Sequence, residues 1–345
     1  MAQHLLKEGN LLNNEGNLIE AGYAFSLVKK YEKAQIKAPK WRIKEWDYYY
    51  VGNDQYGLAL TVADNGYHSL CSITLLDFEK KKEISKSFLS WFTMGKLGLP
   101  ETSAKGDILV EDQRKKYMFS FAHLEDGRRR IIANCEDFGP YKRLFHCDLF
   151  LESTCKDSMV IATPFNKKAH FYYNQKINCL KASGYAKVGN DLYSFDNTSY
   201  GVLDWGRGVW TYKNTWYWSS LNAIQNGHVL GFNLGYGFGD TSQASENMFF
   251  YDGKAFKLDD VRMDIPLGSL GKDDFMRPWT FRSKSGDIAM TFTPIYDRHS
   301  DTNALLIRSN QHQVFGTFSG TITVEGKIYE IHDLLGFAEK VYNRW

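Results

Sequence analysis

The residues best suited to chemistry gather between Gly201 and Trp218. Four of the nine tryptophans fall in this short segment. Successive side chains of a strand point to opposite faces, so Trp216 and Trp218 are expected on one face and Tyr217 on the other. Such an aromatic wall either packs a core or lines a cavity for an apolar ligand. The candidate ligand contacts in this segment are Trp205, Arg207, Trp210, Tyr212, Trp216 and Trp218.

Two charged residues, Asp204 and Arg207, lie in the same aromatic segment. Charges beside an aromatic wall are rarely buried without a partner or a task. One interpretation is a structural pair between them. The other is catalytic, because desolvation in an apolar cavity favours the protonated form of a carboxyl group. Asp204 would then donate a proton to an alkene or carbonyl, and Arg207 would hold an oxygenated ligand.

A second candidate carboxylate, Glu246, opens a predicted strand in the run Ser245-Glu246-Asn247. Its alternative is a solvated position at a barrel rim. Asn247 and Asn233 are further candidate polar contacts to a ligand. Asn233 lies in the glycine-rich run 227–240, which lacks the GxxxxGK[ST] spacing and is not followed by a helical pattern, so nucleotide binding is disfavoured.

The remaining reactive residue types form no recognised motif. The nine His residues lack HExxH or paired spacing, and the five Cys residues lack CxxC spacing, so no metal site is predicted. A GxSxG nucleophile motif is absent as well, which disfavours covalent acyl chemistry. We therefore expect no metal and no cofactor.

The bulk composition limits the class of partner. The 345 residues carry a formal charge of +2, which gives no net field to favour nucleic acid. No apolar run matches a secretory signal or a membrane span, so we expect a cytoplasmic protein without stable membrane insertion. An apolar or amphipathic small molecule is the expected partner, and the oligomeric state is left open.

Aromatic residues make up 15% of the chain, beside 29 Gly and only 7 Pro, a composition that favours sheets. Alternating segments recur between turn signals such as Tyr251-Asp252-Gly253-Lys254 and Glu325-Gly326. We predict an all-β fold of two antiparallel barrels or sandwiches in tandem, with domains 1–170 and 171–345 and a boundary near residues 165–190. Short helices are indicated only at Ala34–Lys40, Ile224–Gln225 and Leu334–Tyr342.

Three segments carry a family resemblance: 204–210, the block from Ser245 to Lys254, and the ending from Gly336 to Trp345. Together they resemble the DUF2804 family of uncharacterised bacterial proteins over nearly the whole chain. More distantly, 203–206 and 326–336 resemble tandem lipocalin-like proteins, a group with carotenoid 1,2-hydratases, AttH-type proteins and fungal decalin-forming cyclases. The resemblance implies two calycin-type barrels holding a large apolar ligand, sometimes with an Asp as acid. AttH-like sequences tend to carry a His after that Asp, whereas this chain has Trp205.

Three hypotheses of function follow. The first is a cofactor-independent hydratase, lyase or isomerase with Asp204 as proton donor and aromatic faces that stabilise a developing carbocation. The second is a non-catalytic lipid carrier or stress-related binding protein, in which Asp204 and Arg207 form a structural pair. Carbohydrate binding ranks third.

Overall fold

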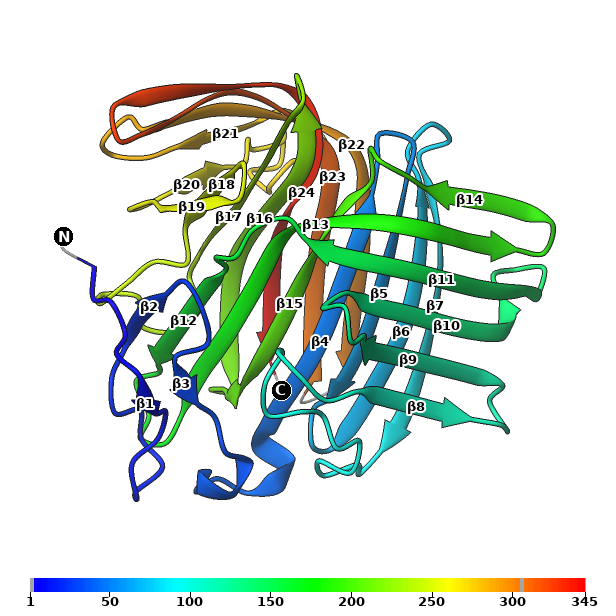
Figure 1. The fold of residues 1–345 in the computed structure, drawn as a ribbon, viewed down its shortest axis with the longest axis horizontal. Helices are drawn as coiled ribbons and strands as arrows, with labels where there is room; N and C mark the ends of the chain where they lie inside the picture. Colours follow the sequence, from blue (N-terminus) through cyan, green and yellow to red (C-terminus); the bar gives the residue numbers. More distant parts are fainter. Residues whose placement is uncertain (1–2, 305–306, 345) are drawn as a thin grey trace.

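Strands account for nearly all the regular structure of the chain (Figure 1). The computed structural model describes residues 3–304 and 307–344. Within those residues the only helical elements are two 3₁₀ turns, η1 (Lys33–Gln35) and η2 (Lys40–Arg42). The predicted all-β fold is confirmed: two curled half-barrel sheets follow one another along the chain.

The larger sheet has thirteen strands. Ten of them follow the order β7-β6-β5-β4-β15-β13-β11-β10-β9-β8, and β2, β12 and β14 pair at its side. The strands are β2 (Gly22–Ala24), β4 (Ile43–Gly52), β5 (Tyr56–Asp64), β6 (His68–Asp77), β7 (Lys82–Trp91), β8 (Ile108–Asp112), β9 (Tyr117–His123), β10 (Arg129–Phe138), β11 (Arg143–Ser153), β12 (Met159–Pro164), β13 (Phe171–Val188), β14 (Asp191–Phe195) and β15 (Tyr200–Val209).

The smaller sheet has nine strands in the order β19-β18-β17-β16-β24-β23-β22-β21-β20. Its strands are β16 (Lys213–Gln225), β17 (His228–Tyr236), β18 (Met248–Tyr251), β19 (Lys254–Lys257), β20 (Arg262–Asp264), β21 (Trp279–Arg282), β22 (Ile288–Ala304), β23 (Ile307–Val324) and β24 (Lys327–Arg344). A separate two-stranded parallel sheet joins β1 (Gly9–Asn10) to β3 (Lys29–Lys30).

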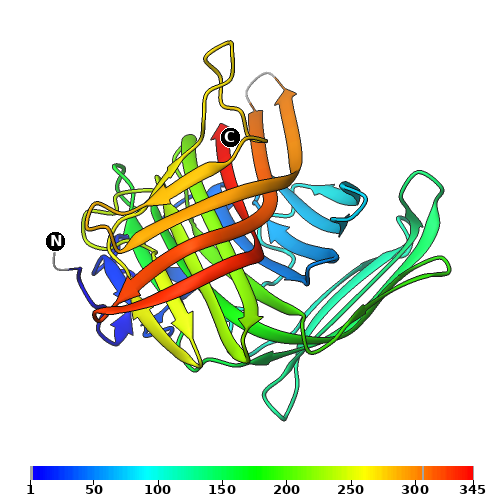
Figure 2. The same ribbon diagram turned by 90° about the horizontal axis from the view of Figure 1, so that it is seen from above.

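A bend in β13 divides the larger sheet into two parts. The first part of β13 pairs with β12 and β15, and the second part pairs with β11 and β14. The register shifts between Ile177 and Leu180, where Cys179 adopts a φ of 58°. Such a bulge bends a strand and increases its twist. The strands β8–β11 and β14 therefore swing away from the smaller sheet (Figure 2).

Each sheet curls around its own apolar core, and two further clusters lie between the sheets. The core of the larger sheet includes Phe119, Phe145 and Trp205. That of the smaller sheet is built around Trp279 and Phe318. The two clusters between the sheets contain Tyr172, Trp210, Phe238 and Met248 in one, and Tyr50, Trp218, Phe315 and Phe337 in the other. Burying one Phe-sized side chain contributes roughly 1.5–3 kcal/mol, so these contacts hold the sheets face to face.

Strand β15 is buried along its whole length because it has a core on each side. Its odd-numbered residues, such as Trp205, join the core of the larger sheet. Its even-numbered residues face the smaller sheet. Gly206 is required there, since a Cβ at that position would lie 1.9 Å from an indole carbon of Trp46.

The predicted short helices are wrong at two of three places. Ile224–Gln225 ends strand β16, and Leu334–Tyr342 lies within β24. The apolar residues of β24 are held by pairing with β16 on one side and β23 on the other, which overrides a local helical pattern. Ala34–Lys40 only overlaps the ends of η1 and η2.

The change from the larger to the smaller sheet comes at residues 210–212, between β15 and β16. The range 165–190, where the boundary was expected, includes β13, a central strand of the larger sheet. The division into domains 1–170 and 171–345 stays a prediction. Among the described residues, no helix has the length and apolarity needed to cross a bilayer.

Candidate functional site

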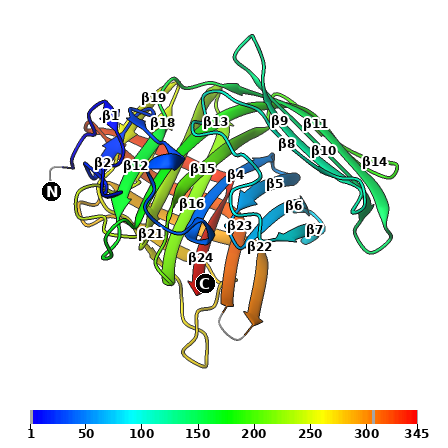
Figure 3. The same cartoon turned by 90° about the horizontal axis from the view of Figure 1, so that it is seen from below.

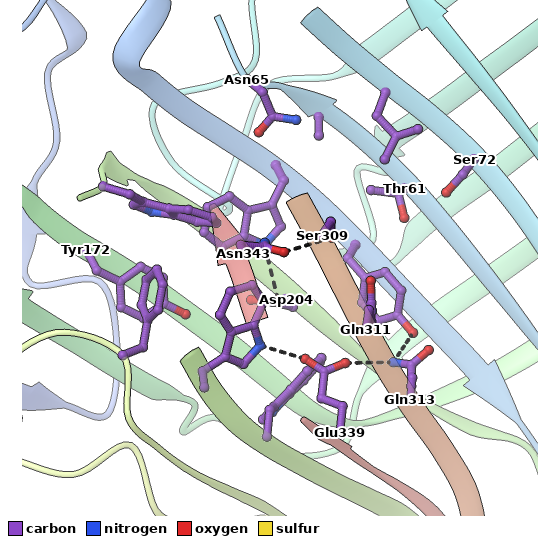
Figure 4. A pocket seen from close by; sticks show the side chains of 18 of the residues that line it. Thr61, Asn65, Ser72, Tyr172, Asp204, Ser309, Gln311, Gln313, Glu339 and Asn343 are labelled. Carbon is purple, nitrogen blue, oxygen red and sulfur yellow. Dashed lines mark hydrogen bonds between the residues drawn. The ribbon is translucent and has the colours of Figure 1, made fainter. Parts of the chain in front are cut away.

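A cavity of about 240 Å³ lies between the two sheets. The larger sheet contributes side chains from β4, β5, β6, β13 and β15, and the smaller sheet from β16, β22, β23 and β24. Figure 4 shows the polar side chains that face it. The cavity therefore depends on strands that are far apart in the sequence and meet only in the folded chain.

One wall of the cavity is aromatic, and the rest is mostly polar. The two predicted tryptophans of β16, Trp216 and Trp218, line it from one strand face, as alternation required. The aromatic residues are Trp46, Tyr48, Tyr172, Trp210, Trp216, Trp218 and Phe238. The uncharged polar residues are Thr61, Asn65, Ser72, Ser309, Gln311, Gln313 and Asn343. The arrangement suits a ligand with an apolar body and polar groups.

Asp204 projects from β15 into the cavity and accepts hydrogen bonds from three donors. Lys176 Nζ lies 2.9 Å from Oδ1, Asn174 Nδ2 lies 2.6 Å from the same oxygen, and Trp46 Nε1 lies 3.1 Å from Oδ2. Lys176 is itself buried and stands 4.0 Å from the ring centre of Trp218. Asp204 is therefore held as an acceptor by an ammonium, an amide and an indole.

Glu339 is the second carboxyl group of the cavity, and sequence reasoning missed it. Its Oε1 accepts from Trp216 Nε1 at 2.8 Å, and its Oε2 accepts from Gln313 Nε2 at 3.3 Å. Burial raises the pKa of Glu339 to about 7, although the Trp216 hydrogen bond and the charge of Lys176 lower it in part. A carboxyl group with this pKa exchanges protons at neutral pH.

Glu246 is the third carboxyl group, and the structure places it in the cavity lining as well. It is 8% exposed, and its Oε2 makes no hydrogen bond within the described residues. Burial, followed by the negative charge of Asp204, raises the pKa of Glu246, and Lys176 opposes this effect. The solvated rim position considered for Glu246 is therefore excluded.

The hydroxyl of Tyr172 lies in the field of all three carboxyl groups. Burial raises the pKa of Tyr172 well above its ordinary value, and Asp204, Glu246 and Glu339 each raise it further. Tyr172 is thus kept as a neutral donor in the cavity that also holds Asp204 and Glu339 (Figure 4).

The predicted pair of Asp204 and Arg207 does not form. The two residues are an odd number of positions apart, so β15 directs them to opposite faces. Arg207 is completely buried, and its Nη2 lies 3.0 Å from Asp47 Oδ1 and 2.8 Å from the carbonyl oxygen of Pro100. Trp205 shares that face and packs 4.4 Å from the Arg207 guanidinium. Arg207 and Trp205 therefore do not line the cavity, whereas Asp204 does.

The other predicted contacts lie behind or outside the cavity wall. Asn233 accepts from Trp218 Nε1 at 2.7 Å and donates to the backbone oxygen of Glu246 at 2.7 Å, so it positions two lining residues. Asn247 accepts from Gly235 N and donates to the oxygen of Asp259, which fixes a turn. Tyr212 is 39% exposed and is not part of the lining.

Several lining residues carried little signal in the sequence. Trp46 and Tyr48 alternate along β4, and this pattern could have identified them as sharing a face. Lys176, Gln313 and Glu339 lie on long strands with no motif around them, and Glu339 fell in a segment interpreted as helical. Only the pairing of β24 with β16 brings Glu339 opposite Trp218 and within reach of Trp216.

Metal binding has no support from the arrangement of donors. Within residues 3–304 and 307–344, no three His, Cys, Asp or Glu side chains are grouped to hold a metal ion. Around Asp204 the neighbours are an ammonium, an amide and an indole, which are donors rather than metal ligands.

The sequence matches a known protein family along nearly its whole length. A model of a domain of unknown function, DUF2804, matches residues 2–345. The chain belongs to the DUF2804 family. No curated protein matches the sequence.

Among solved structures, this DUF2804 member is similar to a protein described as AttH from Nitrosomonas europaea. The two share 13% identity and a TM-score of 0.54 over 87% of this chain and 92% of the other. Kievitone hydratase from Nectria haematococca aligns with 11% identity and a TM-score of 0.47 over 88% of each chain. CghA aligns with 8% identity and a TM-score of 0.43 over 98% of this chain and 97% of the other. The AttH match shows a shared tandem lipocalin-like fold.

Proposed function

We propose that the protein binds a small amphipathic molecule between its two sheets and moves a proton on it, as a cofactor-independent isomerase, lyase or hydratase. The observation that carries this proposal is Glu339, a buried carboxyl group with a pKa of about 7 in the lining of an aromatic cavity. General acids and bases work best when their pKa lies near the working pH.

The size of the cavity limits the ligand. Its volume of about 240 Å³ is below the roughly 300–1,000 Å³ of most ligand pockets. A small ring system with one or two polar groups fits within this space. The large apolar ligand that the family resemblance implied is therefore replaced in this proposal by a compact one.

Within this cavity, Glu339 takes the role of acid or base. In an isomerisation the protonated Glu339 donates a proton to one carbon, and the resulting carboxylate then removes a proton from another carbon, so the reaction balances without a cofactor. Asp204 and Lys176 form a fixed charge pair that orients the polar group of the ligand. The tryptophan faces stabilise a positive charge that develops on the apolar body.

We assign the proton transfer to Glu339 rather than to Asp204 because of their neighbours. Asp204 is engaged by three donors, one of them a full positive charge. Among the described residues, Glu339 accepts hydrogen bonds from the indole of Trp216 and the amide of Gln313, which are neutral, and the charges of Lys176 and Arg298 act on it without a direct ion pair. Glu246 is the reserve candidate, since its Oε2 has no hydrogen-bond partner among the described residues.

Binding is tested first, with 2-naphthol as a compact amphipathic probe and palmitate as a long one. Indole fluorescence should change on addition of 2-naphthol and respond little to palmitate. The Trp216→Phe variant should weaken the response, whereas Trp91→Gln should keep it, because Trp91 is 62% exposed and lies outside the lining. If 2-naphthol leaves the wild-type fluorescence unchanged, the cavity is not the binding site.

Catalysis is tested on any small molecule that co-purifies with the protein and is identified by native mass spectrometry. Incubation in deuterated water should introduce deuterium at carbon, or convert the molecule, with the wild type. The Glu339→Gln variant should bind the molecule and fail to do either. Equal exchange by both proteins would remove Glu339 from the mechanism. Binding without exchange by the wild type would leave a non-catalytic carrier.

A further inference from the structure

The segment that leads into β4 lies on the side of the molecule seen in Figure 3, and it is rich in basic residues. Residues 33–44 read KAQIKAPKWRIK and contain five basic residues and no acidic one; Lys44 is buried and Lys33 pairs with Glu45, so Lys37, Lys40 and Arg42 supply the charge of the surface. Residues 91–100 read WFTMGKLGLP, with one lysine and no acidic residue.

The loop between β5 and β6 holds these two segments together. A Cβ on Gly66 would lie 2.6 Å from the backbone of Trp41, so the loop is packed against the first segment. The amide of Phe92 donates to the oxygen of Tyr67 at 2.6 Å, and that of Met94 donates to the oxygen of Gly66 at 2.7 Å. The two segments therefore form one continuous face.

Large aromatic side chains project from this face. Trp41 is 44% exposed, Trp91 is 62% exposed and Phe92 is 68% exposed. The guanidinium of Arg42 covers the Trp41 ring at 4.6 Å. The lysines Lys37, Lys40 and Lys96 are exposed around them. Exposed indoles beside basic side chains match the interface of a bilayer, where indoles sit at headgroup level.

The backbone conformation of Phe92 is a second, independent observation that favours a role for its exposed side chain. Phe92 has a φ of 57° and Met94 a φ of 51°, values that are uncommon for bulky residues. Asn or Gly would adopt this conformation with less strain. A phenyl ring kept outward at such a position, with most of its surface in water, favours a role in contact with something apolar.

We propose that residues 33–44 and 91–96 dock the protein on an anionic lipid surface. The basic side chains would meet the lipid headgroups, and Trp41, Trp91 and Phe92 would enter the interface. Asn65, which lines the cavity, directly precedes Gly66 in the loop behind this face. Docking would thereby bring the cavity close to a lipid surface from which it could take an amphipathic ligand. Ligand uptake rests on the proposed function, whereas docking does not.

Sedimentation with lipid vesicles tests the docking. The 345-residue chain should bind vesicles of phosphatidylcholine with about 30% phosphatidylserine, dissociate from them as the salt concentration rises, and bind pure phosphatidylcholine far more weakly. Each basic residue near such a surface is worth roughly fivefold in partition. Reversal of Lys37, Lys40 and Lys96 to Glu should therefore reduce binding more than a hundredfold, by about fivefold for each of three residues.

The aromatic contribution needs variants that keep the fold. Phe92→Asn suits the backbone conformation, so the Trp91→Gln, Phe92→Asn double variant should unfold at a urea concentration no lower than the wild type and lose at least tenfold in vesicle binding. Tyr141→Ser is the matched control, because Tyr141 is 82% exposed and lies in the turn between β10 and β11. It should bind vesicles as the wild type does.

Three results would overturn the docking face: no binding of the wild type to anionic vesicles, equal binding to neutral ones, or equal loss in the Tyr141→Ser control. A wild-type dimer in sedimentation velocity that dissociates in the double variant would assign the face to a second copy instead. The response to 2-naphthol should be the same in all these variants. A failure of docking with that response intact would leave the proposed function standing.

Discussion

Replacing Glu339 with Gln should remove a pH-dependent loss of stability. Burial raises the pKa of Glu339 from an ordinary 4.5 to about 7 in the folded protein. A carboxyl group with a higher pKa in the folded state binds more protons when folded. Its contribution to stability is complete below about pH 4.5 and is lost as the pH rises through about 7.

The magnitude follows from the same difference. One pKa unit corresponds to about 1.36 kcal/mol, so the full titration of Glu339 costs roughly 3 kcal/mol of unfolding free energy. Most of that loss, about 2–3 kcal/mol, falls between pH 5 and pH 8. The Glu339→Gln variant has no titrating group at this position, so its unfolding free energy should fall by that much less over the same interval.

Urea unfolding of both proteins at pH 5 and pH 8 measures this difference. The amide introduced by the substitution faces Gln313 Nε2, another donor, and this adds a cost that does not vary with pH. Comparing the change with pH in each protein cancels that constant cost. If wild type and variant lose the same free energy between the two pH values, Glu339 does not titrate near 7, and the proton-transfer proposal loses its main support.

Three further predictions concern residues around this site and in the cores. Arg207→Met should lower the unfolding free energy by about 3–5 kcal/mol in urea, because it strands the buried Asp47 carboxylate; burial raises the pKa of Asp47, so the loss should be smaller at pH 5 than at pH 8. Trp216→Phe removes a hydrogen bond that lowers the pKa of Glu339, so the pH at which the stability loss levels off should move above about 7. Burial raises the pKa of Cys71 and Cys147 to about 12, and all five thiols are free and buried, so a thiol reagent at pH 8 should label the protein only after denaturant is added.

The strands and tight turns could be predicted because their signals are local. The turn at Asp252-Gly253 joins β18 to β19 as expected, with φ angles of 44° and 82°. The turn at Glu325-Gly326 joins β23 to β24 in the same way, with φ angles of 51° and 77°. Such turns need two residues with positive φ, and Asp-Gly and Glu-Gly supply a glycine for the second.

Which strands become neighbours could not be predicted, because that depends on contacts between distant segments. Strand β4 pairs with β15 more than 140 residues later, and β16 pairs with β24, more than 100 residues along the chain. The cavity lies between these pairs, so its lining follows from the pairing and not from any one segment. Asp204, Trp210, Trp216 and Trp218 were identified because they share one segment, whereas Glu339 was out of reach.

The predicted pair of Asp204 and Arg207 was wrong for a different reason, because strand alternation in the sequence already argued against it. In a strand, positions 204 and 207 must face opposite sides, yet their charges and proximity suggested a pair. In the structure each residue pairs with a different partner: Arg207 with Asp47, and Asp204 with Lys176. Alternation is thus a stronger guide to contact within a strand than charge complementarity is.

The two sets of buried charges also differ in how completely they are satisfied. Arg207 meets a carboxylate and the carbonyl oxygens of Trp46, Gly206 and Pro100. Within the described residues Glu339 forms no ion pair, and its hydrogen bonds come from neutral groups. A cation beside Glu339, or an apolar side chain in its place, would stabilise the fold at neutral pH. Glu339 thus has no ion-pair partner among the described residues, whereas Arg207 in the neighbouring core is paired with Asp47, and a carboxyl group left in this state is what a site for proton transfer requires.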